Sequence, residues 1–153
     1  RQESDGGFHA HPAFSHGVPV DRNGLEVLTR EECLRLLGTQ SICRVGITVG
    51  ALPAILPVNF VLHDDLLFIR AVEGRNLHGA MRNTVVAVEA DQIDEVGQSG
   101  WSVLVRGNAY EVTNPDQLDI ACSLGLHSWI GDSDRLIAVH AHSVSGRRIV
   151  PLA

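Results

Sequence analysis

The residues best suited to chemistry follow a run of apolar residues that begins at Leu66 and is typical of a buried strand. Arg70 ends the run, Gly74 and Arg75 follow, and Leu77 begins a spacing of three and four residues that predicts a short helix. Two guanidinium groups and the unpaired N–H groups of a helix start would meet in this turn, a combination that favours an anion such as phosphate. Two surface arginines at a sheet edge are the alternative interpretation.

Other polar residues offer weaker candidates. Asn59, inside an apolar strand, either stabilises a bulge or directs its amide at a ligand. His140 and His142 share one face of a strand, a spacing that zinc can use, but without an evident third ligand we predict no metal site. Glu89 is expected to pair with an arginine such as Arg106 rather than to act in catalysis, and no Ser-His-Asp or Cys-His arrangement stands out.

Composition narrows the class of protein. A chain of 153 residues suits one domain, and a net charge of −6 argues against nucleic-acid binding, which needs a basic stripe. No apolar run approaches the roughly 20 residues that span a bilayer. The three cysteines are too few and too widely spaced for a disulfide framework, and no signal-peptide pattern is visible. We therefore expect a cytoplasmic protein without a membrane partner.

The order of elements predicts a fold that is mainly β (α+β). Residues 1–23, rich in Gly, His, Pro and Ser, are expected to form a flexible N-terminal tail before a single domain over 24–153. Thr29 and Glu32 form a capping box for a helix that ends near Gly38. Strands are expected over 42–49, 54–63, 66–70, 84–91, 100–112 and 134–143, with short helices after 76 and 114. Pro57 implies a sheet edge or bulge, and six antiparallel strands predict a small barrel.

Several segments of the chain stand in an informative order and spacing. They are the helix over 30–38, Arg44-Val45-Gly46, Leu56-Pro57-Val58-Asn59-Phe60, Phe68-Ile69-Arg70 with Gly74 and Leu77, Val88-Glu89-Ala90-Asp91, residues 100–107, and Gly146-Arg147-Arg148-Ile149. Together they resemble the pyridoxamine 5′-phosphate oxidase-like FMN-binding split-barrel family, in its branch of small uncharacterised actinobacterial members. The resemblance covers about residues 28–150 and implies a six-stranded antiparallel split β-barrel with short helices.

The resemblance also implies a homodimer with two FMN sites at the subunit interface. In the family the phosphate, the ring edge and the contribution of the partner subunit each fall on a separate segment. In this chain the phosphate would lie at Arg70, Ala71, Gly74, Arg75, Asn76 and Leu77, the ring near Pro57, Val58 and Asn59, and the partner would offer Trp101 and Ser102.

Two positions depart from the family pattern. Related sequences have threonine after the arginine and lysine in the turn, where this chain has Ala71 and Asn76. Three hypotheses therefore stand. The first is an FMN-dependent oxidoreductase acting on an unknown small molecule. The alternatives are an F420-dependent reductase of the same fold and a non-catalytic dimeric binding protein with a degenerate flavin site.

Overall fold

The computed structural model describes residues 13–15, 17–71, 77–126 and 135–151. Within these ranges the chain forms strands and short helices in the following order: β1 (Ala13–Ser15), β2 (Val18–Val20), β3 (Glu26–Val27), α1 (Arg30–Leu37), β4 (Ile42–Val49), β5 (Leu52–His63), β6 (Leu66–Ala71), α2 (Leu77–Met81), β7 (Thr84–Asp94), β8 (Ser99–Glu111), α3 (Pro115–Ser123), β9 (Arg135–His140) and β10 (Ser143–Ile149).

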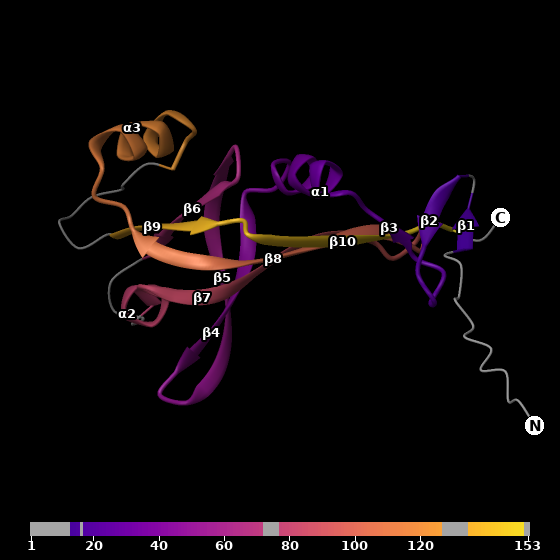
Figure 1. Ribbon diagram of the computed structural model, residues 1–153, viewed down its shortest axis with the longest axis horizontal. Helices are drawn as coiled ribbons and strands as arrows, with labels where there is room; N and C mark the ends of the chain where they lie inside the picture. The colour runs from indigo at the N-terminus through magenta and orange to yellow at the C-terminus, as the bar shows by residue number, and fades with distance from the viewer. Residues whose placement is uncertain (1–12, 16, 72–76, 127–134, 152–153) are drawn as a thin grey trace, which may run out of the picture.

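Six of the strands close into an antiparallel barrel. The order around the barrel is β4, β5, β6, β9, β8 and β7, and β7 returns to β4. The short connections between β4, β5 and β6 form two consecutive antiparallel hairpins. The prediction of a six-stranded antiparallel barrel is confirmed, and Figure 1 shows β10 continuing beyond it along β8.

The alternation of side chains places the core inside the barrel. On β8, Trp101, Val103 and Val105 are buried, whereas Ser102 and Arg106 on the alternate positions are exposed. The same period of two governs β4, where Cys43 and Val45 face inward. Burying an aliphatic side chain of this size contributes about 1.5–3 kcal/mol, so a slip of one residue would expose the whole core.

A glycine allows β8 to serve two neighbours. The first half of β8 pairs with β10, and its end pairs with β9. Between the two halves, a Cβ on Gly107 would overlap the backbone carbonyl of His140, where the chain passes from β9 to β10. Only a residue without a side chain fits this crossing.

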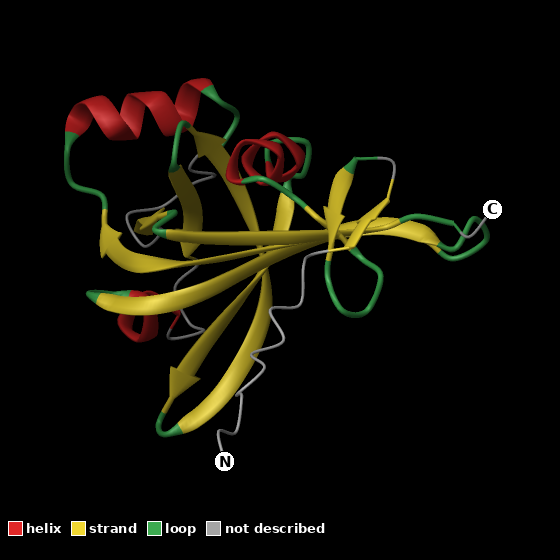
Figure 2. Ribbon diagram, turned by 45° about the vertical axis from the view of Figure 1, so that its right-hand side comes forward, coloured by secondary structure: helices red, strands yellow, loops and turns green. Residues whose placement is uncertain are grey.

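The flexible tail predicted for residues 1–23 extends too far along the chain, because its last residues belong to the fold. Residues Val18–Val20 form β2, which pairs with β1 and β3, and Asp21 accepts a hydrogen bond from Arg147 at 3.0 Å. This small sheet continues from β10 at the end of the molecule away from α3, as Figures 1 and 2 show. Strands of three residues such as β1 and β2 are too short to show a period, so no pattern in the sequence predicted them. Residues 1–12 and 16 lie outside the described part.

The two longer helices begin at the caps that the sequence predicted. The Thr29 hydroxyl accepts from the Glu32 N–H at 3.2 Å, and the Asn114 side chain accepts from the Asp116 N–H at 2.9 Å. α1 lies over β10, and α3 covers a second apolar cluster on the outside of β6 and β9. No helix in the described part of the chain is long and apolar enough to cross a membrane.

Candidate functional site

The strand β5 changes its partner along its length. Leu52–Asn59 pair with β4, and Phe60–His63 pair with β6. Among the described residues, no strand pairs with the other edge of Leu52–Val58. The prediction that Pro57 marks an edge is confirmed. An unpaired edge tolerates proline, because in a position paired on both sides its missing N–H would interrupt the hydrogen-bond ladder.

The open edge of β5 is rich in acceptors. The Phe60 N–H donates to the Ser41 carbonyl at 3.1 Å, so even-numbered residues bond to β4. Backbone groups alternate along a strand, and the odd-numbered Pro53, Ile55 and Pro57 therefore face the open edge. These residues present three carbonyl oxygens and one N–H, because two of them are prolines. Such an edge resists pairing with another strand but can accept hydrogen bonds from a ligand.

Asn59 and Arg70 line one cavity at the end of this edge. The β5–β6 register pairs Phe60 with Ile69, and one further step places Asn59 opposite Arg70. Their side chains lie on the outer face of the barrel, on the same side as Phe68. The cavity of about 230 Å³ is completed by Ser41, Phe60, Val61, Leu124, Gly125 and Leu126.

A second cavity of about 190 Å³ shares Arg70 and Leu126 with the first. Its charged lining includes Glu111 and Arg135, whose side chains form an ion pair at 3.2 Å. Val112, Leu118, Cys122 and Leu136 supply the rest of the described lining. Arg70 therefore lies between two adjoining cavities beneath α3.

Two of the predicted site residues turn their side chains away from these cavities. Val58 is 9% exposed and Ala71 is 1% exposed, and both belong to the barrel core. The period of two requires this, because each directly neighbours a residue of the outer face. Ala71 lines neither cavity. The described lining of the two cavities therefore loses no polar group through having alanine instead of threonine at this position.

Part of the predicted phosphate turn lies outside the described residues. This applies to Gly74, Arg75 and Asn76. Leu77 is the first residue of α2. Of the predicted phosphate site, Arg70, Ala71 and Leu77 are thus described, and Arg70 is the one among these three that lines the two cavities.

Trp101 and Ser102 lie far from Arg70 within one chain. Arg70 pairs with Leu136 on β9, and the adjacent part of β8 is near Tyr110. At about 3.3 Å per residue, the stretch of β8 between Ser102 and Tyr110 spans roughly 25 Å. The fold thus brings Asn59 and Arg70 together and separates them from Trp101 and Ser102.

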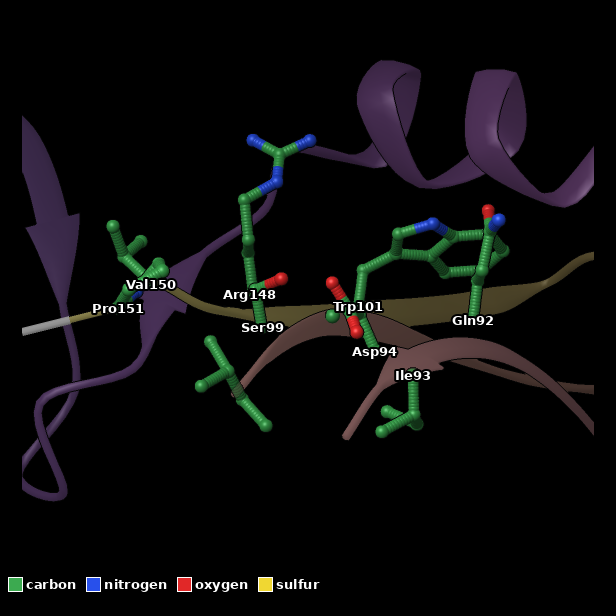
Figure 3. A pocket seen from close by; sticks show the side chains of 10 residues that line it. Gln92, Ile93, Asp94, Ser99, Trp101, Arg148, Val150 and Pro151 are labelled. Atoms are coloured by element: carbon green, nitrogen blue, oxygen red, sulfur yellow. The ribbon is translucent and has the colours of Figure 1, made fainter. Parts of the chain in front are cut away.

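The Trp101 end has a cavity of its own, of about 420 Å³. The indole ring lies beneath α1, beside Gln92, and the guanidinium of Arg148 points toward the same helix, as Figure 3 shows. Arg148 donates to Glu32 at 3.0 Å. Ser102 is exposed on the opposite face of β8, so the two neighbours cannot contact one ligand from the same side.

Glu89 pairs with Arg44 instead of Arg106. The β4–β7 register places Arg44 directly opposite Glu89, and Arg44 Nη1 lies 3.2 Å from Glu89 and 3.3 Å from Asp91. Arg106 lies opposite Ala87. Burial, followed by the neighbouring Asp91 carboxylate, raises the pKa of Glu89 above its ordinary value. This cluster lies on the outer face and lines neither of the two cavities beneath α3.

Among the described residues, the histidines and buried thiols form no reactive centre. His140 lies 2.9 Å from Asp65, and the described residues contain no group of three His, Cys, Asp or Glu side chains placed to hold a metal. Burial raises the pKa of Cys43 to about 12 and also raises that of Cys33. Both thiols therefore remain protonated and unreactive near neutral pH.

The sequence analysis did not predict Glu111 and Arg135 as site residues. They come from the ends of β8 and β9, and only the pairing of these strands brings them beside Arg70. The one available signal was that each is a charged residue at the end of an apolar strand.

Comparison with known proteins identifies the family. The model of the pyridoxamine 5′-phosphate oxidase family matches residues 29–148, and the chain belongs to this family. An uncharacterized protein of Mycobacterium tuberculosis is 36% identical over 145 residues, which cover 91% of this chain and 95% of that protein.

Solved structures of relatives share the fold. An FAD-binding protein from Mycobacterium smegmatis is 33% identical with a TM-score of 0.71, covering 80% of this chain and 98% of that one. A conserved protein of unknown function from Corynebacterium diphtheriae is 29% identical with a TM-score of 0.69, covering 82% and 98%.

Proposed function

We propose that this protein is a flavin-dependent oxidoreductase that binds FMN and acts on a small molecule. The observation that carries the proposal is the meeting of the open β5 edge with the cavity of Asn59 and Arg70. An anion-binding guanidinium lies beside an acceptor-rich edge, and FMN carries both a phosphate and a planar ring with a hydrogen-bond donor. The FAD-binding relative from Mycobacterium smegmatis supports a flavin in general.

The residues present fit such a ligand. Arg70 is half-buried beside apolar Val61 and Leu126, where a charged hydrogen bond to phosphate contributes about 1.5–3 kcal/mol. The Pro57 carbonyl and the Asn59 amide would orient the ring. Bound flavin supplies the redox chemistry itself, so the protein needs to bind, orient and shield it rather than provide strong acids or bases.

The active form in this proposal is a homodimer. A cavity of about 230 Å³ is smaller than the roughly 300–1,000 Å³ typical of whole ligand sites. Beside the open edge, Leu52 and Ile55 are 71% and 73% exposed, and Ile42 on β4 is 57% exposed. A second copy would cover these side chains and bring its own segment of β8 at Trp101 and Ser102 to the ring, with one of these two side chains facing it. The three cysteines are free thiols, which supports the cytoplasmic location proposed here.

A visible absorption spectrum after addition of FMN, FAD or F420 and removal of unbound cofactor tests this proposal. We expect retained FMN near one per chain and its loss in Arg70→Ala, with Arg35→Ala on α1 as a control for removal of an exposed arginine. Retention of F420 alone would move the assignment to a deazaflavin reductase. If no cofactor is retained, the proposal is wrong, and the fold serves as a non-catalytic dimeric binding protein.

A further inference from the structure

The outer face of the barrel is uncovered along four neighbouring strands, β5, β4, β7 and β8. Their register lines up one outward-facing residue from each strand in a row: Pro57, Arg44, Glu89 and Leu104. No helix of the described chain packs on this face, because α1 lies over β10, α3 covers β6 and β9, and α2 directs Met81 into the core inside the barrel. Figure 1 shows α1 and α3 on one side of the molecule and the β4–β5 hairpin on the opposite side.

This outer face exposes large apolar side chains. Ile42 on β4 is 57% exposed, Ile55 on β5 is 73% exposed and Val85 on β7 is 70% exposed. Cys43 and Val86, one step along the same strands, point the other way and are buried in the core. Exposed apolar side chains that gather on one face mark a surface that a partner covers.

The charged residues of this face balance one another. Its outward-facing positions on the four strands carry two guanidinium groups, Arg44 and Arg106, and two carboxylates, Glu89 and Asp91. The whole chain has a net charge of −6, so an average part of its surface would repel a second copy. A neutral face with both signs of charge instead favours a copy of itself over a strongly charged partner.

Opposite charges stand side by side on this face, so it can complement itself. Arg44 on β4 lies directly opposite Glu89 on β7, and Arg44 Nη1 is 3.2 Å from Glu89 and 3.3 Å from Asp91. A two-fold axis that runs between β4 and β7, along the strands, lays β4 of one copy over β7 of the other. Each Arg44 then lies over the Glu89 of the second copy. Packed sheets keep their strands within about 30° of each other, which this arrangement satisfies.

Covering by a second copy strengthens these ion pairs. The Arg44 side chain is 53% exposed and that of Glu89 is 32% exposed, so the pair contributes little within one chain. Between two sheets water is excluded, and each charge has opposite charges beside it and above it, which offsets the cost of desolvation. The same axis lays β5 of one copy over β8 of the other, where the apolar stem of Arg106 covers Ile55.

We propose that the outer face of β5, β4, β7 and β8 docks a second copy of this chain, with Arg44 of each copy bound to Glu89 of the other across a two-fold axis. This inference rests on the homodimer of the proposed function, and it assigns the surface and the central ion pairs of that homodimer. It also gives the exposed Ile42, Ile55 and Val85 a place in the interface.

Charge reversal in two separate variants tests the ion pairs across the axis. Sedimentation equilibrium measures the dimer dissociation constant of wild type, Arg44→Glu, Glu89→Arg and the control Arg35→Glu. Arg35 is also an exposed arginine paired with a glutamate, but it lies on α1. We expect each of the two variants to raise the dissociation constant at least about 30-fold, because like charges then face each other across the axis, and the control to stay within about twofold.

An equimolar mixture of the two variants separates contacts between copies from contacts within one chain. In a mixed dimer the new glutamate of one chain faces the new arginine of the other, and the unchanged Arg44 faces the unchanged Glu89. Each chain still carries like charges side by side, which mixing cannot repair. We therefore expect the mixture to dissociate within about tenfold of the wild-type constant. If mixing restores nothing, the pair acts within one chain and the inference is overturned.

Val85→Ser tests the apolar part of the face without changing its charge. Because Val85 is 70% exposed, one chain loses little packing and should fold as before, which circular dichroism checks. We expect the dimer dissociation constant to rise about three- to tenfold. The control Val96→Ser lies in the turn between β7 and β8, where Val96 is 97% exposed, and should leave the constant unchanged.

The outcomes separate this inference from the proposed function. If wild type is a dimer that neither charge reversal nor Val85→Ser weakens, the copies meet through another surface, and the homodimer stands while the inference is wrong. If wild type stays monomeric at every concentration, the homodimer and the inference both fail. Retention of flavin, measured separately by absorption, then decides whether the flavin assignment survives for a single chain.

Discussion

The two ends of β8 lie in different surroundings. At one end three charged residues, Arg70, Glu111 and Arg135, line a small cavity, and a second small cavity adjoins it at Arg70. At the other end Trp101, Ile93 and Ile149 border a larger cavity with an apolar floor. One chain cannot bring the two ends together, because a strand is stiff and roughly 25 Å separates them. The comparison teaches that a site using both ends must be assembled from two copies.

The largest expected effect on stability comes from Gly107, which lies on β8 between the two ends. Gly107→Ala forces a Cβ into the His140 carbonyl and should destabilise the protein by at least about 3 kcal/mol, because backbone must move. Urea unfolding measures this. In the control Gly46→Ala the new Cβ would lie 3.6 Å from that of Ala87, an ordinary contact, and the change should stay within about 1 kcal/mol. Equal losses of stability at both glycines would contradict the claim that only glycine fits beside the His140 carbonyl.

A mixing experiment tests whether the two ends cooperate between copies. Arg70→Ala damages the charged end, and Ser102→Tyr places a bulky side chain at the exposed end of β8. Each variant alone should retain little flavin. After the two are unfolded and refolded together, about one quarter of the sites should be intact, because half of the dimers are mixed and each has one undamaged site. No recovery on mixing would place the whole site within one chain.

At the Trp101 end of β8, the Glu32 carboxylate should contribute less to the stability of the fold in acid. Hydrogen bonds from Arg35 and Arg148 lower the pKa of Glu32 from 4.5 to about 2. The folded state thus favours the carboxylate, and its contribution is complete above pH 4.5 and is lost as the pH falls toward 2. We expect Glu32→Gln to destabilise the protein at pH 7 and to matter progressively less below pH 4.5, as measured by urea unfolding across that range.

The neighbouring Glu31→Gln is the control for this acid effect, since it removes the same charge from the same helix turn. A difference between wild type and Glu32→Gln that stays constant down to pH 2 would contradict the role of the two arginines.

The smallest effect is expected at the open edge of β5. Pro57→Ala restores an N–H that points away from β4, and the stability of the fold should change by less than about 1 kcal/mol. The variant should instead associate more readily, because the edge gains a donor for strand pairing. Light scattering at increasing concentration measures this, with the even-numbered Ala54→Ser as the control. Unchanged association would mean that proline does not protect this edge.

The sequence by itself determined the elements of the fold. Alternating apolar residues predicted β4 to β9, and local caps predicted α1 and α3, because these signals depend on neighbours a few residues apart. The number of strands predicted a small barrel, and the family resemblance specified a split barrel of six strands. The short strands β1 and β2 escaped prediction because their few residues carry no period.

Only the tertiary structure decided which side chains meet. Register brought Arg44 to Glu89 and Arg135 to the cavity of Arg70, and it turned Val58 and Ala71 into the core. Pairs such as these are set by how strands align across the barrel, and one step of register reverses every side chain. The residue types were visible in the sequence, but their partners depend on contacts between segments far apart along the chain.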